Sequence, residues 1–474
     1  MVDRFDLVVI GSGPGGQRAA IQAAKLGKRV AVVEKSDQLG GAALRAGTIP
    51  SKALREAALI LTGMGGTRML AGHRPVRRDV TIGELTAVVR DVIAAQLRVV
   101  EDAFARNRVT LLRGRARFAD LHTIVIEEEG GARTVTGDRI VIAVGTRPAQ
   151  PAHIPFNDRT IFTTDTLRHL TQLPQSFVVV GGGVIGTEFA CILAALGVQV
   201  TLVEGRTELL GFVDREIIEA FQTAIRRQGV TLRLGEQVLM IEETVGNGGT
   251  GSVRATLESG KELHAEALLY AVGRQGVCHE LGLERVGLAC DDRERLTVNE
   301  HYQTAVPHIY AVGDVIGFPA LAATAMEQGR LAACHAFDVP AQSLPRLFPF
   351  GIYAIPEIAM VGETEQNLTK AGVPYESGVA RYEELARGEM LGDRDGLLKL
   401  LVHQRDRRLL GVHIIGTSAT ELIHIGQMVM AVNGKVDMLV DNVFNYPTLA
   451  EAYKVAAYNA VNKLAQLRPP SARA

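Results

Sequence analysis

A glycine-rich fingerprint occurs twice in this chain of 474 residues, each time directly after an apolar run and directly before a helical pattern. The first copy follows residues 5–10 and reads Gly11, Ser12, Gly13, Pro14, Gly15, Gly16. The second follows residues 176–180 and reads Gly181, Gly182, Gly183, Val184, Ile185, Gly186. A strand that turns through glycines into a helix is the start of a Rossmann-like βαβ unit. Two copies therefore predict two such units in one chain.

An acidic residue closes each unit at the same spacing. Glu34 follows the apolar run 29–33 and Glu204 ends the run 198–203, each 23 residues after the first glycine of its loop. A carboxylate at this place accepts hydrogen bonds from a ribose diol, while the glycines allow the turn, the approach of a pyrophosphate and close helix packing. The sequence thus predicts two dinucleotide sites.

Three further apolar runs indicate how the chain is divided. Residues 140–144 end at Gly145, residues 267–272 end at Gly273, and residues 308–312 are followed by Gly313 and Asp314, whose carboxylate can bind a ribityl or ribose hydroxyl. We expect an α/β fold whose first nucleotide domain is discontinuous (1–150 and 274–347), with the second (151–273) inserted into it. Residues 348–474 lack a phosphate loop and predict an α+β domain with strands at 397–402 and 409–415 and a helix at 420–432. Glycine-rich stretches at 129–132 and 246–252 predict hairpin loops.

Composition limits the classes of partner. The formal net charge is −1 and no long run of lysine or arginine occurs, so nucleic acid and anionic membrane surfaces are not expected partners. No apolar run has membrane-spanning length, and we expect a cytoplasmic protein. Cys191, Cys278, Cys290 and Cys334 are scattered without metal-ligand or CxxC spacing, so neither a metal site nor dithiol chemistry is expected. Cys191 is interpreted as a small core side chain.

With these motifs, nearly the whole chain resembles the flavoprotein disulfide reductase superfamily. The resemblance implies an FAD domain, an NAD(P) domain and a carboxyl-terminal dimerisation domain. It implies FAD contacts at the first loop, its acid and several later positions: Gly11, Ser12, Gly13, Pro14, Gly16, Glu34, Lys35, Gly41, Ala43, Thr48, Lys52, Gly145, Asp314 and Ala322. It implies NAD(P) contacts at Gly181, Gly183, Val184, Ile185, Gly186, Glu188, Glu204, Arg206 and Gly273. Lys52 and Glu188 match a pair that lies beside the flavin where hydride passes.

Two departures from that superfamily decide the expected chemistry. Ala43 and Thr48 stand where disulfide reductases carry two redox cysteines, and without sulfur they cannot form a mixed disulfide. Tyr446 precedes Pro447 in the motif where those enzymes have a catalytic histidine, and a tyrosine hydroxyl is a poor acid or base for a thiol at neutral pH. Disulfide reduction is therefore excluded.

A nicotinamide nucleotide is the one evident electron donor or acceptor that remains for the flavin. This indicates hydride exchange between NADPH and NAD+ by a ping-pong scheme through reduced flavin. The strings around residues 47–55 and 444–448 are similar to the soluble pyridine nucleotide transhydrogenase family, also called Si-specific NAD(P)+ transhydrogenases. FAD, NAD(H) and NADP(H) are the cofactors and substrates that this resemblance implies, in a homodimer or larger homo-oligomer.

Several alternatives remain open at this point. The chain is alternatively a diaphorase that reduces a quinone, or a catalytically inactive dinucleotide-binding protein. Arg206 is either a ligand of the 2′-phosphate of NADP(H) or a solvated loop charge, and Arg274 is a weaker candidate for the same role. Tyr446 either contacts the flavin from a partner subunit or packs in the protein. His424 is assigned no chemistry, and the sequence does not fix the direction of the reaction.

Overall fold

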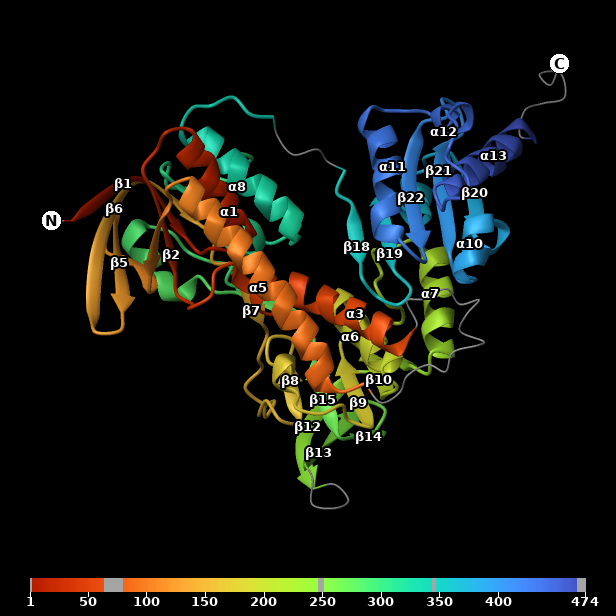
Figure 1. Cartoon of the computed structure of the whole chain (residues 1–474), viewed down its shortest axis with the longest axis horizontal. Coiled ribbons are helices and arrows are strands. Elements are labelled where there is room, and N and C mark those ends of the chain that lie inside the picture. Colours follow the sequence, from red (N-terminus) through yellow and green to blue (C-terminus); the bar gives the residue numbers. More distant parts are fainter. Residues whose placement is uncertain (1, 64–79, 246–250, 343–346, 467–474) are drawn as a thin grey trace.

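The computed structural model describes residues 2–63, 80–245, 251–342 and 347–466. Three sheet-centred units make up the molecule, and Figure 1 shows them as the N-terminal unit at upper left, a second unit at the bottom and the C-terminal unit at upper right. Helices α3 (Thr48–Thr62) and α5 (Ile82–Arg106) run between the first two units. Among the described residues, no helix combines the length and apolar character that crossing a bilayer requires.

The first unit is a Rossmann-like sheet in the order β3-β2-β1-β6-β5-β4, with β17 added beside β6. Its strands are β1 (Asp3–Ile10), β2 (Val30–Glu34), β3 (Thr110–Arg113), β4 (Arg115–Phe118), β5 (Thr123–Glu128), β6 (Gly131–Ile142) and β17 (Ile309–Ala311). Its helices are α1 (Pro14–Lys25), α2 (Gly41–Arg45) and α8 (Ala322–Ala336), with short 3-10 helices η2 (His279–Leu281), η3 (Leu283–Val286) and η4 (Gly313–Ile316). The β6–β17 pairing is parallel, so the chain returns to this sheet after it has passed through the second unit.

The second unit is a parallel sheet in the order β11-β10-β9-β15-β8. Its strands are β8 (Ile161–Thr163), β9 (Ser176–Val180), β10 (Gln199–Glu204), β11 (Thr231–Leu234) and β15 (Ala267–Tyr270). An antiparallel meander of β12 (Val238–Val245), β13 (Gly251–Leu257) and β14 (Glu262–Ala265) extends from it, and its helices are α6 (Val184–Ala195), α7 (Arg215–Arg227) and the 3-10 helix η1 (Leu167–His169). The chain enters and leaves this unit through a two-stranded ribbon of β7 (Thr146–Pro148) and β16 (Arg274–Gly276).

The third unit is an antiparallel sheet in the order β18-β19-β22-β21-β20. Its strands are β18 (Phe350–Ile352), β19 (Ile358–Gly362), β20 (Tyr375–Arg381), β21 (Leu397–His403) and β22 (Leu409–Ile415). Its helices are α9 (Glu365–Lys370), α10 (Ala386–Leu391), α11 (Ala419–Ala431), α12 (Asp437–Asp441) and α13 (Glu451–Gln466), with the 3-10 helix η5 (Tyr382–Glu384).

The predicted fold class, two Rossmann-like units followed by an α+β unit, is confirmed. Strands β9 and β22 have the predicted bounds. The strand predicted at 140–144 is instead the end of the longer β6, which stops at Ile142 because its partner β1 stops at Ile10. A hairpin joins β5 to β6 as predicted, but its loop is shorter than 129–132, because Gly131 already pairs with Glu128. Strand β12 pairs with β13 as the second hairpin prediction requires, although residues 246–250 themselves lie outside the described residues.

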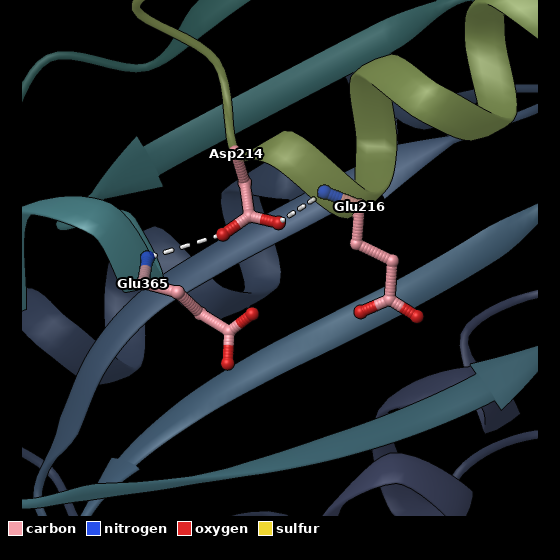
Figure 2. Close-up of side chains that lie close together, drawn as sticks. All are labelled: Asp214, Glu216 and Glu365. Atoms are coloured by element: carbon pink, nitrogen blue, oxygen red, sulfur yellow. Dashed lines mark hydrogen bonds between the residues drawn. The ribbon is translucent and has the colours of Figure 1, made fainter. Parts of the chain in front are cut away.

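A buried charge cluster joins the second and third units. Asp214 is fully buried, and its carboxylate accepts hydrogen bonds from the backbone N of Glu216 in α7 at 3.2 Å and of Glu365 in α9 at 3.1 Å, as Figure 2 shows. The Lys399 ammonium, also fully buried, lies 2.8 Å from Asp214, 3.0 Å from Glu216 and 2.5 Å from Glu365. One carboxylate thus caps the N-terminal turns of two helices from different units, and the buried lysine pairs with it and with the partly exposed Glu216 and Glu365.

Candidate functional site

A cavity of about 680 Å³ lies where the three units meet, and residues from all three line it. Almost the whole set predicted for FAD is on its wall: Gly11, Ser12, Gly13, Pro14, Glu34, Lys35, Gly41, Ala43, Thr48, Lys52, Gly145, Asp314 and Ala322. The second unit contributes three of the predicted NAD(P) residues, Val184, Ile185 and Glu188. The topology therefore brings residues more than 300 positions apart in sequence to one continuous wall, from Gly11 to Asp314.

The first glycine loop has the steric signature of a phosphate-binding turn. Gly11 has φ +104°, and a Cβ there would lie 2.4 Å from the Ala143 carbonyl oxygen. A Cβ on Gly16 would lie 2.0 Å from the Gly11 carbonyl oxygen, which explains why Gly16 is needed although it lies behind the cavity wall that the described residues form. A Cβ on Gly13, the N-cap of α1, would meet nothing within 4 Å, so this side of the loop is open to a ligand.

Glu34 is held so that one oxygen keeps free acceptor capacity. Its Oε2 accepts hydrogen bonds from the Ser12 backbone N at 3.0 Å and the Ser12 hydroxyl at 2.6 Å, and its Oε1 accepts one from Ser36 N at 2.9 Å. The Ser12 hydroxyl in turn accepts from Gly40 N at 3.0 Å. A carboxylate offers about four acceptor positions, so Glu34 can still accept a ribose hydroxyl.

A polar relay crosses the far end of the cavity. Thr146 in β7 donates its hydroxyl hydrogen to Asp314 Oδ2 at 3.2 Å and accepts a hydrogen bond from Arg274 Nε at 2.9 Å. Arg274 also donates to the Thr146 carbonyl oxygen at 2.9 Å and lies 3.5 Å from Asp165. Arg274 is part of the β7–β16 ribbon and lines the main cavity, whereas Glu204 and Arg206 are outside the lining that the described residues form.

Lys52 and Glu188, predicted as a pair, form an ion pair across the junction of the first two units. Lys52 Nζ lies 2.6 Å from Glu188 Oε2, and the side chain of Glu188 is only 4% exposed. Glu188 Oε1 accepts a hydrogen bond from Tyr353 N at 2.8 Å, and the ammonium lies 5.0 Å from the centre of the Tyr353 ring. Burial raises the pKa of the Tyr353 hydroxyl, which keeps this ring neutral beside the pair.

Residues from the third unit complete the wall, and the sequence interpretation missed them. Tyr353, Thr420, Ile423 and His424 all line the cavity. Thr420 donates its hydroxyl hydrogen to Glu357 at 2.9 Å, and Glu357 pairs with buried Arg55 of α3 at 3.1 Å. No local motif marks these residues, because they reach the site through tertiary contacts: Arg55 of α3 bonds Ala354 and Glu357 in the β18–β19 connection, and Glu357 bonds Thr420. His424, to which the sequence assigns no chemistry, is one of these lining residues.

The second glycine loop repeats the geometry of the first. Gly181 has φ +107°, and a Cβ on Gly186 would lie 1.9 Å from the Gly181 carbonyl oxygen. Glu204 Oε2 accepts a hydrogen bond from Gly182 N at 2.7 Å, and Arg206 pairs with Glu204 at 3.0 Å. Gly181, Gly183, Gly186, Glu204, Arg206 and Gly273 lie outside the lining that the described residues give the main cavity. The loop thus forms a separate surface that meets the cavity at Val184, Ile185 and Glu188.

Ala43, Thr48 and Tyr446 stand where the superfamily that this chain resembles has redox cysteines and a catalytic histidine, and they do not all lie at the cavity. Ala43 and Thr48 line the cavity, so the wall carries a methyl group and a hydroxyl where related enzymes have sulfur. Tyr446 is 69% exposed and lies outside the cavity lining formed by the described part of this chain. Its predicted contact with a flavin requires a second subunit.

Two of the four cysteines form a disulfide, which their scattered spacing did not indicate. The structure joins Cys278 and Cys290, 12 residues apart, in a disulfide, whereas Cys191 and Cys334 are free and buried. Their spacing gave no signal because the 3-10 helices η2 and η3 fold the segment back on itself. Among the described residues that line the main cavity, none is a cysteine.

Two family models cover most of the chain. Pyridine nucleotide-disulphide oxidoreductase matches residues 5–329, and the dimerisation domain of the same family matches residues 348–457. A protein from Mycobacterium bovis named soluble pyridine nucleotide transhydrogenase is 52% identical over 98% of this chain and 98% of its own length. A protein of the same name from Chromohalobacter salexigens is 43% identical over 98% of this chain and 99% of its own.

Two solved structures are similar to this chain over most of its length. LpdA from Mycobacterium tuberculosis is similar with a TM-score of 0.88 and 27% identity, over 96% of this chain and 99% of that one. RclA from Escherichia coli, described as an HOCl-induced flavoprotein disulfide reductase, has a TM-score of 0.85 and 26% identity, over 96% of this chain and 99% of its own.

Proposed function

The chain belongs to the pyridine nucleotide-disulphide oxidoreductase family and, within it, to the soluble pyridine nucleotide transhydrogenases, and from this premise we propose that it transfers hydride reversibly between NADPH and NAD+ in a ping-pong reaction. FAD supplies the hydride-carrying ring when bound. The observation that carries the proposal is the Lys52–Glu188 ion pair, which lies in the wall of the main cavity where the cavity meets the second glycine loop.

The residues of the cavity fit FAD. Its volume of about 680 Å³ lies in the range of pockets that enclose a large cofactor. Gly13 leaves open space at the N-terminus of α1 for a pyrophosphate, and Glu34 and Asp314 offer carboxylate oxygens to hydroxyl groups at the wall. We propose the predicted FAD set as its ligands.

We propose that Lys52 acts through its positive charge and that Glu188 holds the Lys52 ammonium in place. The ammonium, 26% exposed, is held by Glu188 and the Tyr353 ring, and its positive charge would stabilise negative charge on a reduced flavin bound in the cavity. Glu188 is itself fixed by the Tyr353 backbone N. Because these groups are already oriented, little reorganisation is required when the charge develops.

The same wall argues for nicotinamide as the source and the destination of the hydride. Ala43 and Thr48 offer no sulfur to pass electrons to a disulfide substrate. The Cys278–Cys290 disulfide does not replace them, because the described lining of the main cavity contains neither residue. We propose that one nucleotide leaves before the next binds beside the same pair.

We place NAD(H) and NADP(H) on the second glycine loop, with Gly181, Gly183, Gly186, Glu204, Arg206 and Gly273 as contacts. On the proposed division, 1–150 and 274–347 bind FAD, 151–273 bind the nicotinamide nucleotide, and 348–474 make the dimer. The matched dimerisation domain supports a homodimer, in which Tyr446 contacts the partner's flavin site. A cytoplasmic location accords with the intracellular pools of both nucleotides.

The test is an anaerobic, two-step experiment on the FAD-loaded protein. One equivalent of NADPH is added and the flavin absorbance is followed, and then NAD+ is added. We expect the oxidised flavin spectrum to return while an equal amount of NADH forms. A flavin that stays reduced until a quinone is added would replace this proposal with a diaphorase, and a protein that binds no flavin would indicate an inactive binding protein.

A further inference from the structure

The two nucleotide loops provide an internal comparison within one chain. In both, an acid at the end of the second strand accepts a hydrogen bond from the backbone N of the residue after the first glycine, Ser12 for Glu34 and Gly182 for Glu204. In both, the acid also accepts one from the backbone N two residues further on, Ser36 N at 2.9 Å and Arg206 N at 2.9 Å. The side chains around the two acids are what differ.

The first loop uses a serine hydroxyl where the second uses a guanidinium. Ser12 donates its hydroxyl hydrogen to Glu34 at 2.6 Å. Gly182 has no side chain to do so, and a Cβ there would lie 2.5 Å from Leu209 and 3.0 Å from Glu204. In its place Arg206 donates from Nε to Glu204 Oε1 at 3.0 Å and from its terminal nitrogen to Oε2 at 3.1 Å.

Arg206 therefore occupies the acceptor positions that a ribose diol needs. Each oxygen of Glu204 has two donors, one from the backbone and one from the guanidinium. Burial favours the neutral acid, but the hydrogen bonds from Arg206 and Gly182 outweigh it and lower the pKa of Glu204. The carboxylate is ionised, paired and filled to about its four acceptor positions.

The two partners differ in freedom to move. The Glu204 side chain is 10% exposed and fixed by two backbone donors, whereas the Arg206 side chain is 58% exposed. The guanidinium can turn away into solvent while the carboxylate stays in place. NAD(H) would then exchange the two guanidinium donors for two ribose hydroxyls, and a 2′-phosphate would receive the guanidinium itself.

We propose that Arg206 sets the balance between the two nucleotides by changing partners: it opposes NAD(H) by covering Glu204, and it favours NADP(H) by leaving Glu204 for the 2′-phosphate. The inference rests on the proposed function, because it assumes that both nucleotides use the second loop. It adds a consequence that a simple phosphate ligand would not have. Removing Arg206 must strengthen the binding of NAD+ as well as weaken the binding of NADP+.

The experiment is isothermal titration of the FAD-loaded, full-length protein with NAD+ and, separately, with NADP+. For Arg206→Ala we expect the Kd of NADP+ to rise about tenfold or more, as for the loss of a hydrogen bond to a charged group. We expect the Kd of NAD+ to fall about two- to fivefold, the range of a partly exposed ion pair. For Glu204→Gln we expect weaker NAD+ binding and no loss for NADP+.

Arg226→Ala is the matched control, since Arg226 is an exposed arginine of the same unit whose side chain bonds Gln222. It should change neither constant. An unchanged or raised Kd of NAD+ in Arg206→Ala would overturn the competition, and an unchanged Kd of NADP+ would overturn the phosphate contact. These constants involve no turnover, so a protein that binds as expected but fails to exchange hydride would contradict the proposed function and not this inference.

Discussion

Lys52 is fixed at the junction of two units by contacts that its own sequence motif does not contain. Glu188 comes from the helix after the second glycine loop and Tyr353 from the segment after β18. The motif around Pro50 and Ser51 predicted that Lys52 matters, and the pair with Glu188 was predicted by resemblance. The ring of Tyr353 could not be predicted, because its contact depends on how the third unit packs.

At this residue scale, Lys52→Met tests whether the charge accelerates hydride transfer. We expect the rate of flavin reduction by NADPH, followed by anaerobic stopped flow, to fall about 10²-fold, the effect of losing one oriented electrostatic contact. Lys25→Met is the control, because Lys25 is an exposed lysine at the end of α1 and lies outside the cavity lining that the described residues form. A Lys52→Met protein that is reduced as fast as Lys25→Met would contradict the assignment.

At the scale of elements, the turn from β9 into α6 separates packing from ligand approach. A Cβ on Gly186 would meet the Gly181 carbonyl oxygen at 1.9 Å, whereas a Cβ on Gly183 would meet nothing within 4 Å. The fingerprint predicted both glycines without distinguishing the two reasons. Only the path of the backbone shows that one glycine serves the fold and the other leaves space for a ligand.

Alanine substitutions at these two glycines should therefore affect different properties, stability in one case and NAD+ binding in the other. Gly186→Ala should lower the thermal unfolding midpoint, because α6 must move away from β9. Gly183→Ala should leave the midpoint within about 2 °C of the parent but weaken NAD+ binding about tenfold or more, because the methyl group occupies the approach of the pyrophosphate. Calorimetry measures the unfolding midpoint of both variants, and titration measures their NAD+ binding. Normal NAD+ binding by Gly183→Ala would contradict the predicted contact.

The Asp214 cap gives a pH-dependent prediction for the contact between α7 and α9. Burial opposes the charge of Asp214, but His413, Lys399 and the Glu365 backbone N outweigh it, so its pKa is lowered on folding. A lowered folded pKa gives stability that is complete above the unfolded value of about 3.9 and is lost as the pH falls through the folded value. The contact should therefore hold at neutral pH and fail in acid.

Asp214→Asn should destabilise the protein by about 3 kcal/mol at pH 7, since it leaves part of a buried ion pair unbalanced. The difference from the parent should begin to shrink below about pH 4, because the unfolded parent binds a proton there that the folded Asp214 binds only at lower pH. Thermal unfolding from pH 7 to pH 3 measures it. Asp138→Asn, which breaks the exposed Arg4–Asp138 pair, should cost less than about 1 kcal/mol, and an equal effect of both changes would contradict a special role for Asp214.

At the scale of the whole molecule, much of the architecture could be predicted from the chain. The two fingerprints and their acids fixed the order of the first two units, since each rests on local turn sterics. The Cys278–Cys290 pairing, the Asp214–Lys399 contact and the place of His424 could not be predicted, because each depends on tertiary packing that no short spacing encodes.

Large apolar side chains near the end of the third unit, including Val443 (92% exposed) and Tyr446 (69%), indicate where a second subunit packs.

Subunit contact is tested by charge at that surface. Val443→Asp with Tyr446→Asp should shift the sedimenting species from twice the chain mass of 50.9 kDa toward the monomer. Val245→Asp is the matched control, because Val245 is 82% exposed at the end of β12 in another unit and should leave the dimer intact. Retention of the dimer by the double variant, or its loss in the control, would move the interface elsewhere.

The ribbon of β7 and β16 has a consequence for how such a chain arises and changes. Its strands pair Thr146 with Gly276 and Pro148 with Arg274, so the entry and exit of the whole 151–273 segment lie side by side. A segment with adjacent ends can be inserted, lost or exchanged while the host sheet keeps its course.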